Sequence, residues 1–313
     1  MNKKLVQEIT ECLPQGKTPF PYFRYRYAAM LLPWLVPDGT AIAELKKRPV
    51  GKLLEKPPTR QALEQCGDGR FSAAGCHLAW AEPHEDFLLT LSEWSGERGY
   101  SQLSRSGSNL VLQVNMNQSL LHLFEKLVTD DYHWRFYNFG HPILRQRQDG
   151  MVRQTLGWIR IDLDLQSDEA LIEEVQSDWL RAANKCVRLY QSMALRYNLR
   201  AEARHLLSYS EYVINRFAKI WDEALLAAAL WFIREEIGIR TVWYHTFESG
   251  GVLKRIKYQQ PPRSLYVDLP RKFCFERTAE HPQFLLHERS YRRTLARQKN
   301  IHWHRLVLNQ ACY

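Results

Sequence analysis

Two segments with alternating apolar and polar residues constrain the fold of this chain most strongly. Residues 155–163 and 170–175 show the period of two that predicts β-strands, and the polar turn at 166–168 joins them. Helical spacing follows over residues 177–197, where Ser177 is a suitable N-cap and Asp178 occupies the first turn. We therefore expect a β-hairpin whose second strand leads directly into a long helix.

The segments after this hairpin predict a sheet covered by helices. A helix is expected over residues 211–236, which include the apolar block 224–233, and a further strand over 239–246. Because a helix separates this strand from the hairpin, a right-handed crossover would place it parallel to the strand at 170–175. Residues 151–313 are therefore expected to form an α+β module with a mixed, mainly antiparallel sheet covered by long helices.

The first half of the chain, residues 1–150, is expected to be a helical and β-hairpin region that packs on the C-terminal module. Prolines interrupt residues 1–60 repeatedly, and each one lacks an amide donor and restricts the residue before it, which predicts short helices. Alternating residues over 87–94 and 109–116 predict an antiparallel hairpin. A boundary between the two regions is placed near Gly150.

Composition restricts the class of protein and the kind of partner. An apolar content of 45% and a charged content of 25% are typical of a folded globular protein. The net charge of +9 favours an anionic partner such as nucleic acid, a phosphate compound or an acidic protein. The longest apolar run, residues 224–233, is about half a membrane span, so no membrane partner is expected.

The cysteines indicate the cellular compartment. Their spacing contains no Cys-x-x-Cys pair, so neither a zinc ribbon nor a disulfide framework is predicted. We expect reduced thiols and a cytoplasmic protein. The six residues are Cys12, Cys66, Cys76, Cys186, Cys274 and Cys312.

Polar side chains concentrate where the second strand leads into the helix. Strict alternation would place Glu173 and Glu174 on opposite strand faces, with Gln176 on the face of Glu174. Arg160 of the neighbouring strand would be close enough to pair with Glu174. A buried ion pair beside a helix cap would explain this group structurally. A carboxylate tuned by Arg160 for acid/base chemistry, or for binding a cationic ligand, is the functional alternative.

The order of several motifs resembles a module found in large polyvalent proteins of phages and conjugative elements. The middle motif, Leu-Ile-Glu-Glu-Val-Gln-Ser-Asp-Trp, is similar to the "EEIQSDW" element of that module. The resemblance covers roughly residues 133–277 and implies a mobile-element-type protein. The matching motifs lie at residues 157–162, 171–179, 221–226, 238–243 and 265–270.

The same layout is more distantly similar to the GNAT acyltransferase fold, in which a strand runs into a phosphate-binding turn and a helix. Residues 265–275 look like the segment that closes the sheet, with Cys274 where that family has glycine. The chain departs from the family after Val175, where no glycine offers bare amides to the pyrophosphate of coenzyme A. The resemblance implies a GNAT-like module, either transferase-like or a degenerate transferase, that binds a small anionic or nucleotide-type ligand. The sequence does not identify a cofactor.

These considerations give three sets of candidate residues. The catalytic candidates are Glu174, Asp178 and His245, the last of which would lie near Gln176 if the strands are parallel. The candidate ligand-binding residues are Arg160, Gln176, Ser177 and Tyr266. As an alternative, a non-enzymatic protein would use its basic segment 289–305 to bind nucleic acid or an acidic protein through Arg289, Arg292, Arg293 and Arg297.

Two further patterns have simpler explanations than a functional site. His302 and His304 would share a strand face, but no third ligand has a suitable spacing, so no metal site is expected. Residues 104–108, Ser-Arg-Ser-Gly-Ser, resemble a phosphate-binding turn in composition. They lack the spacing of a P-loop, and a polar hairpin loop explains them better.

Overall fold

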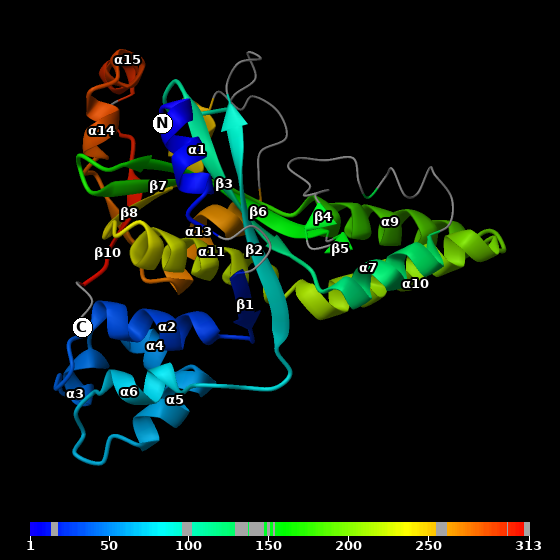
Figure 1. Ribbon diagram of the computed structural model, residues 1–313, viewed down its shortest axis with the longest axis horizontal. Coiled ribbons are helices and arrows are strands. Elements are labelled where there is room, and N and C mark those ends of the chain that lie inside the picture. Colours follow the sequence, from blue (N-terminus) through cyan, green and yellow to red (C-terminus); the bar gives the residue numbers. More distant parts are fainter. Residues whose placement is uncertain are drawn as a thin grey trace.

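The chain is an α+β protein built on one mixed, mainly antiparallel sheet (Figure 1). The computed structural model describes residues 1–13, 18–95, 102–128, 137, 147–148, 151–152, 154–254, 262–298 and 300–309. Eight strands follow one another across the sheet in the order β1-β2-β3-β6-β7-β8-β10-β9. These strands are β1 (Thr18–Tyr22), β2 (Glu85–Ser95), β3 (Ser108–Asn115), β6 (Thr155–Asp164), β7 (Glu169–Gln176), β8 (Thr241–His245), β9 (Glu276–Thr278) and β10 (Trp303–Val307).

The strand pairing confirms the predicted hairpins. β2 pairs antiparallel with β3, and β6 pairs antiparallel with β7. β8 lies parallel to β7, as the crossover argument predicted, and every other pair in the large sheet is antiparallel. A separate two-stranded sheet consists of β4 (Arg147–Gln148) and β5 (Met151–Val152).

Helices cover the sheet and extend beyond it. Short helices make up much of the N-terminal region, as the prolines predicted, whereas the longer ones follow β7. The helices are α1 (Lys3–Thr10), α2 (Arg26–Leu35), α3 (Ile42–Leu45), α4 (Gly51–Leu54), α5 (Pro57–Glu64), α6 (Ala73–His77), α7 (Gln118–Leu127), α9 (Asp178–Ala194), α10 (Ala201–Phe217), α11 (Trp221–Trp231), the π-helix η1 (Phe232–Glu236), α12 (Phe247–Leu253), α13 (Arg263–Lys272), α14 (Gln283–Leu286) and α15 (Arg289–Arg297).

The helix predicted over residues 211–236 is wrong in its extent. α10 begins ten residues earlier, at Ala201, and ends at Phe217, and a short turn precedes α11. The two helices have different surroundings: α10 packs along α9, whereas α11 is buried almost throughout and packs against β3, β6 and β7. The chain must change direction between these two environments, which breaks the helix.

Apolar residues on the two faces of the sheet belong to different cores. On β7 and β8, Ile172 and Tyr244 join the main core, which includes α11 and α2. Leu171 and Trp243 join a smaller core that α14, α15 and β10 complete. Burial on both faces explains why β7 has so few exposed residues.

The two halves of the chain share the sheet. β3 pairs with β6, so hydrogen bonding continues from the first region to the second. Gly150, where the boundary was placed, lies outside the described residues, and the division into two regions stays a prediction. Within the part of the chain that the structure describes, no helix is both long and apolar enough to cross a membrane.

α9 and α10 form a helical hairpin that extends away from the sheet, at the right of Figure 1. Its base is fixed by a cluster of four aromatic side chains, in which Trp179 contacts Phe124 of α7, Tyr137 and Tyr209 of α10. The indole Nε1 of Trp179 also donates a hydrogen bond to the Tyr209 hydroxyl at 3.1 Å. The Trp of the Ser-Asp-Trp motif is therefore a structural anchor for this hairpin.

The segment expected to close the sheet is a helix and not a strand. Residues 265–275 form most of α13 and the turn after it, and β10 supplies the neighbour of β8 instead. Cys274 nevertheless has a left-handed backbone, with φ of 62°. That conformation is one that favours glycine.

Candidate functional site

β7 contains a β-bulge at the predicted site. Arg160 pairs with Glu174, whereas the next residue, Ile161, pairs with Ile172, so Glu173 is the extra residue. Arg160 forms an ion pair with Glu174, as predicted, and its charge also acts on Glu173. The prediction that the two carboxylates point apart is wrong, because the bulge shifts the alternation of the strand by one residue.

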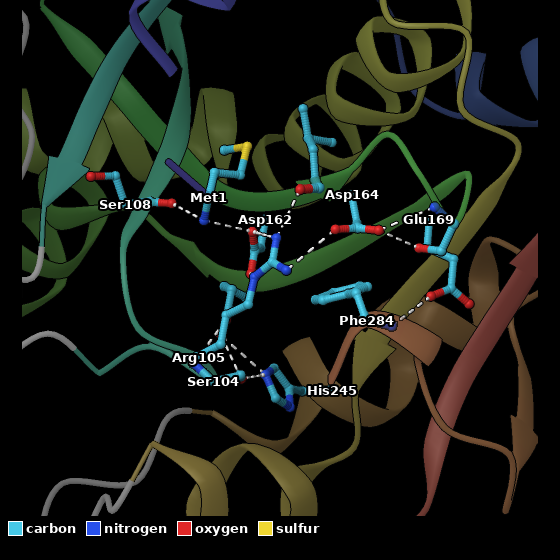
Figure 2. Close-up of polar contacts among 12 residues, drawn as sticks. Met1, Ser104, Arg105, Ser108, Asp162, Asp164, Glu169, His245 and Phe284 are labelled. Carbon is cyan, nitrogen blue, oxygen red and sulfur yellow. Dashed lines mark hydrogen bonds and ion pairs between the residues drawn. The ribbon is translucent and has the colours of Figure 1, made fainter. Parts of the chain in front are cut away.

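Glu173 lies in a buried polar network with residues from two other segments. Its carboxylate accepts hydrogen bonds from the backbone N–H of Ser104 at 2.9 Å and from the Ser104 hydroxyl at 3.0 Å. The imidazole Nε2 of His245 lies 3.1 Å from Glu173 Oε2 and 3.0 Å from Ser104 Oγ. Figure 2 shows Ser104 and His245 facing each other. The network joins the β2–β3 connection to β7 and β8.

Positive charges keep Glu173 ionised inside the protein. Burial by itself would raise the pKa of Glu173, but the hydrogen bond with His245 and the charges of Lys254 and Arg160 lower it to about 2. Burial lowers the pKa of His245 and outweighs the hydrogen bond and the charge of Glu173, which raise it, while Lys254 and Arg160 act in the same direction as burial. At neutral pH we therefore assign an ionised Glu173 and a neutral His245 whose Nε2–H faces the carboxylate.

This network differs from a Ser-His-acid triad. In a triad one imidazole nitrogen faces the serine and the other faces the carboxylate. Here Ser104 and Glu173 both approach Nε2 of His245, and Nδ1 lies 3.1 Å from the hydroxyl of Ser249. Ser104, Glu173 and His245 are all buried. The arrangement therefore serves as a structural link in this state of the protein.

A cleft of about 600 Å³ opens beside the end of β7. Within the described residues, the parallel pairing with β8 ends at Ile172 and Tyr244, whereas β7 continues to Gln176. The last residues of β7 therefore have an edge without a strand beside it, and they line the cleft. The residues that line the cleft are Glu174, Val175, Gln176, Ser177, Leu180, Arg181, Asn184, Lys185, Arg188, Ala218, Trp221, Pro262 and Leu265.

The walls of this cleft differ in character. One face of α9 contributes Arg181, Lys185 and Arg188, which are all exposed. The spacing of four and then three residues places them on one side of the helix. Trp221 and Leu265 contribute apolar surface from α11 and α13. The cleft thus combines a cationic wall with an apolar wall that includes an aromatic ring.

Three of the predicted residues line the cleft. Gln176 and Ser177 do so together with Glu174, whose side chain is 17% exposed. Ser177 also caps α9, as predicted, by accepting a hydrogen bond from the backbone N–H of Leu180 at 3.1 Å. Arg160 lies behind Glu174, where its side chain is 1% exposed.

The other predicted residues are held in contacts within the protein. Asp178 accepts hydrogen bonds from Trp158 Nε1 at 3.0 Å and from Gln176 Nε2 at 2.5 Å, and it pairs with Arg181 at 3.3 Å. Tyr266 and His245 are buried. None of these three candidates is among the described residues that line the cleft.

The basic wall of the cleft was not among the predicted site residues. Arg181, Lys185 and Arg188 follow the motif at helical spacing, and this spacing was the available signal. A basic helix face is usually a solvated surface, so the spacing alone does not identify a site. The cleft becomes apparent only when Trp221 and Leu265, which are distant in the sequence, lie opposite this face.

The loop at residues 104–108 is a polar hairpin connection, as expected. Arg105 binds Asp162 through two hydrogen bonds of 2.7 and 2.9 Å, and the α-amino group of Met1 lies 3.2 Å from the same carboxylate (Figure 2). At Gly107, where φ is 119°, an added Cβ would lie 2.4 Å from the carbonyl oxygen of Met1. The loop packs closely against the N-terminus, and its charges are used internally.

The C-terminal arginines form a second basic surface. Arg289, Arg292, Arg293 and Arg297 are exposed on α15, and none of them has an ion pair with another described residue. α15 lies at the opposite end of the molecule from the α9–α10 hairpin in Figure 1.

His304 makes a hydrogen bond with the carbonyl oxygen of Tyr266 at 3.0 Å. Among the described residues, no group of three or more His, Cys, Asp or Glu side chains is arranged to hold a metal ion.

No protein family model matches the chain, and no curated protein or solved structure matches it either.

Proposed function

We propose that this protein binds a small anionic ligand of nucleotide type in the cleft formed by the end of β7, α9, α11 and α13. The observation that carries this proposal is the position of Arg181, Lys185 and Arg188 on one wall of the cleft, opposite Trp221 and Leu265. A ligand with a phosphate group and an apolar or aromatic part would satisfy both walls at once.

The charges around the cleft favour an anion. Glu174, the one carboxylate among the described residues that line it, is neutralised by the ion pair with Arg160, which lies behind it. Asp178 offsets part of the charge of Arg181. Lys185 and Arg188 add further positive charge at the rim, and a positive field in a hollow raises the local concentration of phosphate compounds.

The edge of β7 supports a ligand with an extended polar part. Residues 174–176 line the cleft, and β8 does not pair with them. Backbone groups at such an edge can bind an extended ligand through hydrogen bonds of the kind that join strands. This feature supports binding of a ligand longer than a simple phosphate ion.

The transferase-like character of the module belongs to the same proposal. It is supported by the resemblance of the motifs to GNAT enzymes and to the polyvalent proteins of mobile elements, and by the layout of a strand that leads into a capped helix. The turn at Ser177 lacks glycine, so we do not propose that its backbone amides bind the pyrophosphate of coenzyme A. A cytoplasmic location is proposed with it.

Isothermal titration calorimetry with ADP, ATP, coenzyme A and inorganic pyrophosphate tests this function. We expect at least one of these probes to bind with a Kd below 1 mM and to raise the melting temperature. The double variant Arg181→Glu with Lys185→Glu should weaken that binding at least tenfold. The matched control is Lys47→Glu with Arg60→Glu, which makes the same charge change at exposed residues of the N-terminal region.

The proposal fails if none of the four probes binds, or if both double variants weaken binding equally. Circular dichroism and the melting temperature of each variant without a probe show whether the fold is retained. Since Arg181 and Lys185 are exposed on α9, their replacement should change the stability by less than about 1 kcal/mol.

A second candidate function uses α15. Its exposed arginines lack ion pairs with the described residues, and this observation favours binding of nucleic acid or an acidic protein without catalysis. Binding of duplex DNA should then weaken steeply as the salt concentration rises. If the double variant Arg292→Glu with Arg293→Glu keeps its full affinity for duplex DNA, α15 is excluded as the DNA-binding surface.

A further inference from the structure

We infer that the anionic ligand of the cleft is the end of a single-stranded nucleic acid, whose next nucleotides lie along α9 toward the tip of the α9–α10 hairpin. This inference rests on the function proposed for the cleft and names the class of its ligand. It is carried by the continuation of the basic residues beyond the cleft and by the side chains exposed at the tip.

The basic wall of the cleft is one end of a longer basic track. Arg181, Lys185 and Arg188 line the cleft, and Arg196 and Arg200 follow at the tip of the hairpin. With a rise of about 1.5 Å per residue, α9 ends roughly 10 Å beyond Arg188, the last of its residues that line the cleft.

The sequence of this segment lacks negative charge. From Trp179 to Ala201 the chain contains five Lys or Arg residues and no Asp or Glu. Among the described neighbours, Asp178 pairs with Arg181 at the cleft end, and Glu211 of α10 accepts a hydrogen bond from Gln191. The sequence of the track is therefore basic along its length, which suits a linear polyanion.

Apolar and aromatic side chains are exposed where the track ends. Tyr197 is 68% exposed, Leu195 is 89% exposed, and Leu189 and Met193 on α9 are 53% and 39% exposed. Bases of a single strand can stack on aromatic rings and cover apolar surface, and each stacked base contributes about 1–3 kcal/mol. In a duplex the bases are already stacked, so a duplex could not use these side chains.

The arrangement distinguishes a nucleic acid strand from a membrane surface. The basic residues follow one another along the chain from the cleft through α9 to the tip, whereas a bilayer would contact the tip alone. The aromatic wall of the cleft, Trp221, offers a further ring for the terminal base. A strand is the ligand that would use the cleft, the track and the tip together.

Fluorescence anisotropy with single-stranded oligothymidylates of 2, 5, 10 and 20 nucleotides, together with competition by dTMP, tests the inference. We expect the affinity to rise at least tenfold from the dinucleotide to the decamer and then to level off. The decamer should show a steeper dependence on salt than the dinucleotide, because each added phosphate contact contributes about 0.7 to the slope.

A variant with Arg196→Glu and Arg200→Glu changes the far end of the track. It should weaken binding of the decamer at least tenfold more than binding of dTMP. The charge-matched control is again Lys47→Glu with Arg60→Glu, which should not distinguish the two ligands. The substituted residues are exposed in both variants, and circular dichroism checks that the fold is retained.

The outcomes separate this inference from the proposed function. If dTMP and the decamer bind equally well, the inference is overturned and the proposed function stands. If a duplex of the same length binds as well as the single strand, the inference is overturned. Binding to phosphatidylcholine vesicles with 20% phosphatidylserine that depends on Arg196 and Arg200, without decamer binding, would overturn it in favour of a membrane. If neither dTMP nor the decamer binds, and the four probes of the cleft also fail, both proposals are overturned.

Discussion

His245 Nε2 lies 3.1 Å from Glu173 Oε2 in the interior of the protein, and neither side chain is exposed to solvent. The contact connects β7 and β8 one residue beyond the last backbone pair, Ile172 with Tyr244. Side chains therefore continue the connection between the two strands after their hydrogen-bonded pairing has ended, at the place where the cleft begins.

This contact predicts a dependence of stability on pH. The pKa of His245 is lowered in the folded protein, so the unfolded chain binds the extra proton as the pH falls below its ordinary value of 6.5. The stability that His245 contributes is complete above that pH and is lost below it. Urea denaturation from pH 8 to pH 5 should show a larger loss in the wild type than in His245→Gln, because His281 and His304, whose pKa values are also lowered, titrate in both proteins.

Glu173 adds a second pH range, below that of His245, in which the protein loses stability. Its pKa is about 2 in the folded protein, against 4.5 in the unfolded chain, so its contribution is complete above pH 4.5 and is lost as the pH falls toward 2. At about 1.4 kcal/mol per pKa unit, the contribution is about 3 kcal/mol.

The pH dependence of the wild type alone does not isolate the contributions of His245 and Glu173. Burial raises the pKa of Asp222 and Glu223, which changes the stability in the opposite direction. The wild type should therefore be compared with His245→Gln and Glu173→Gln at each pH. Equal pH dependence in all three proteins would show that these two groups do not titrate as the contacts require.

The pair of Arg160 and Glu174 should show energetic coupling. Arg160 is buried, also donates to the carbonyl oxygen of Gln102 and lies over the ring of Trp94, so loss of Glu174 would leave a buried charge without its carboxylate. We expect Glu174→Gln to cost about 2–3 kcal/mol and the double-mutant cycle with Arg160→Met to give about 1–3 kcal/mol of coupling. Additive effects of the two substitutions in chemical denaturation would disprove the pairing.

Trp179 should contribute more to stability than the exposed Trp80. It is 2% exposed and contacts three aromatic rings, so Trp179→Ala is expected to cost about 3–5 kcal/mol. Trp80 is 48% exposed, and Trp80→Ala serves as the matched control with an expected cost near 1 kcal/mol. Similar losses for the two variants in urea denaturation would contradict the anchoring role of Trp179.

The cysteines should differ in their reactivity. Cys12 is exposed, whereas burial raises the pKa of Cys76 to about 12 and that of Cys274 to about 11. Since the thiolate is the reactive form, iodoacetamide at pH 8 should modify Cys12 at least tenfold faster than the other two thiols. Peptide mass spectrometry measures the rates, and addition of urea should equalise them. Fast modification of Cys76 in the folded protein would contradict its burial.

Local sequence patterns determined most of the secondary structure around the site. The two hairpins, the parallel strand at 241–245 and the Ser177 cap were all predictable, because each depends on a period of two, on helical spacing or on a capping residue within a few positions. The Arg160–Glu174 pair was predicted only from the proximity of the two strands, because the register set by the turn would place Arg160 opposite Glu173, and the bulge brings Glu174 there instead.

The tertiary structure decided what the site contains. A bulge placed Glu173 and Glu174 near one arginine, and no pattern of alternation reveals such an extra residue. Ser104 and His245 reach Glu173 from segments 69 and 72 residues away, through pairings that depend on the whole sheet. Local periodicity specifies which residues share a face of a strand or helix. Only packing specifies which faces meet, and it placed the basic face of α9 opposite Trp221 to form the cleft.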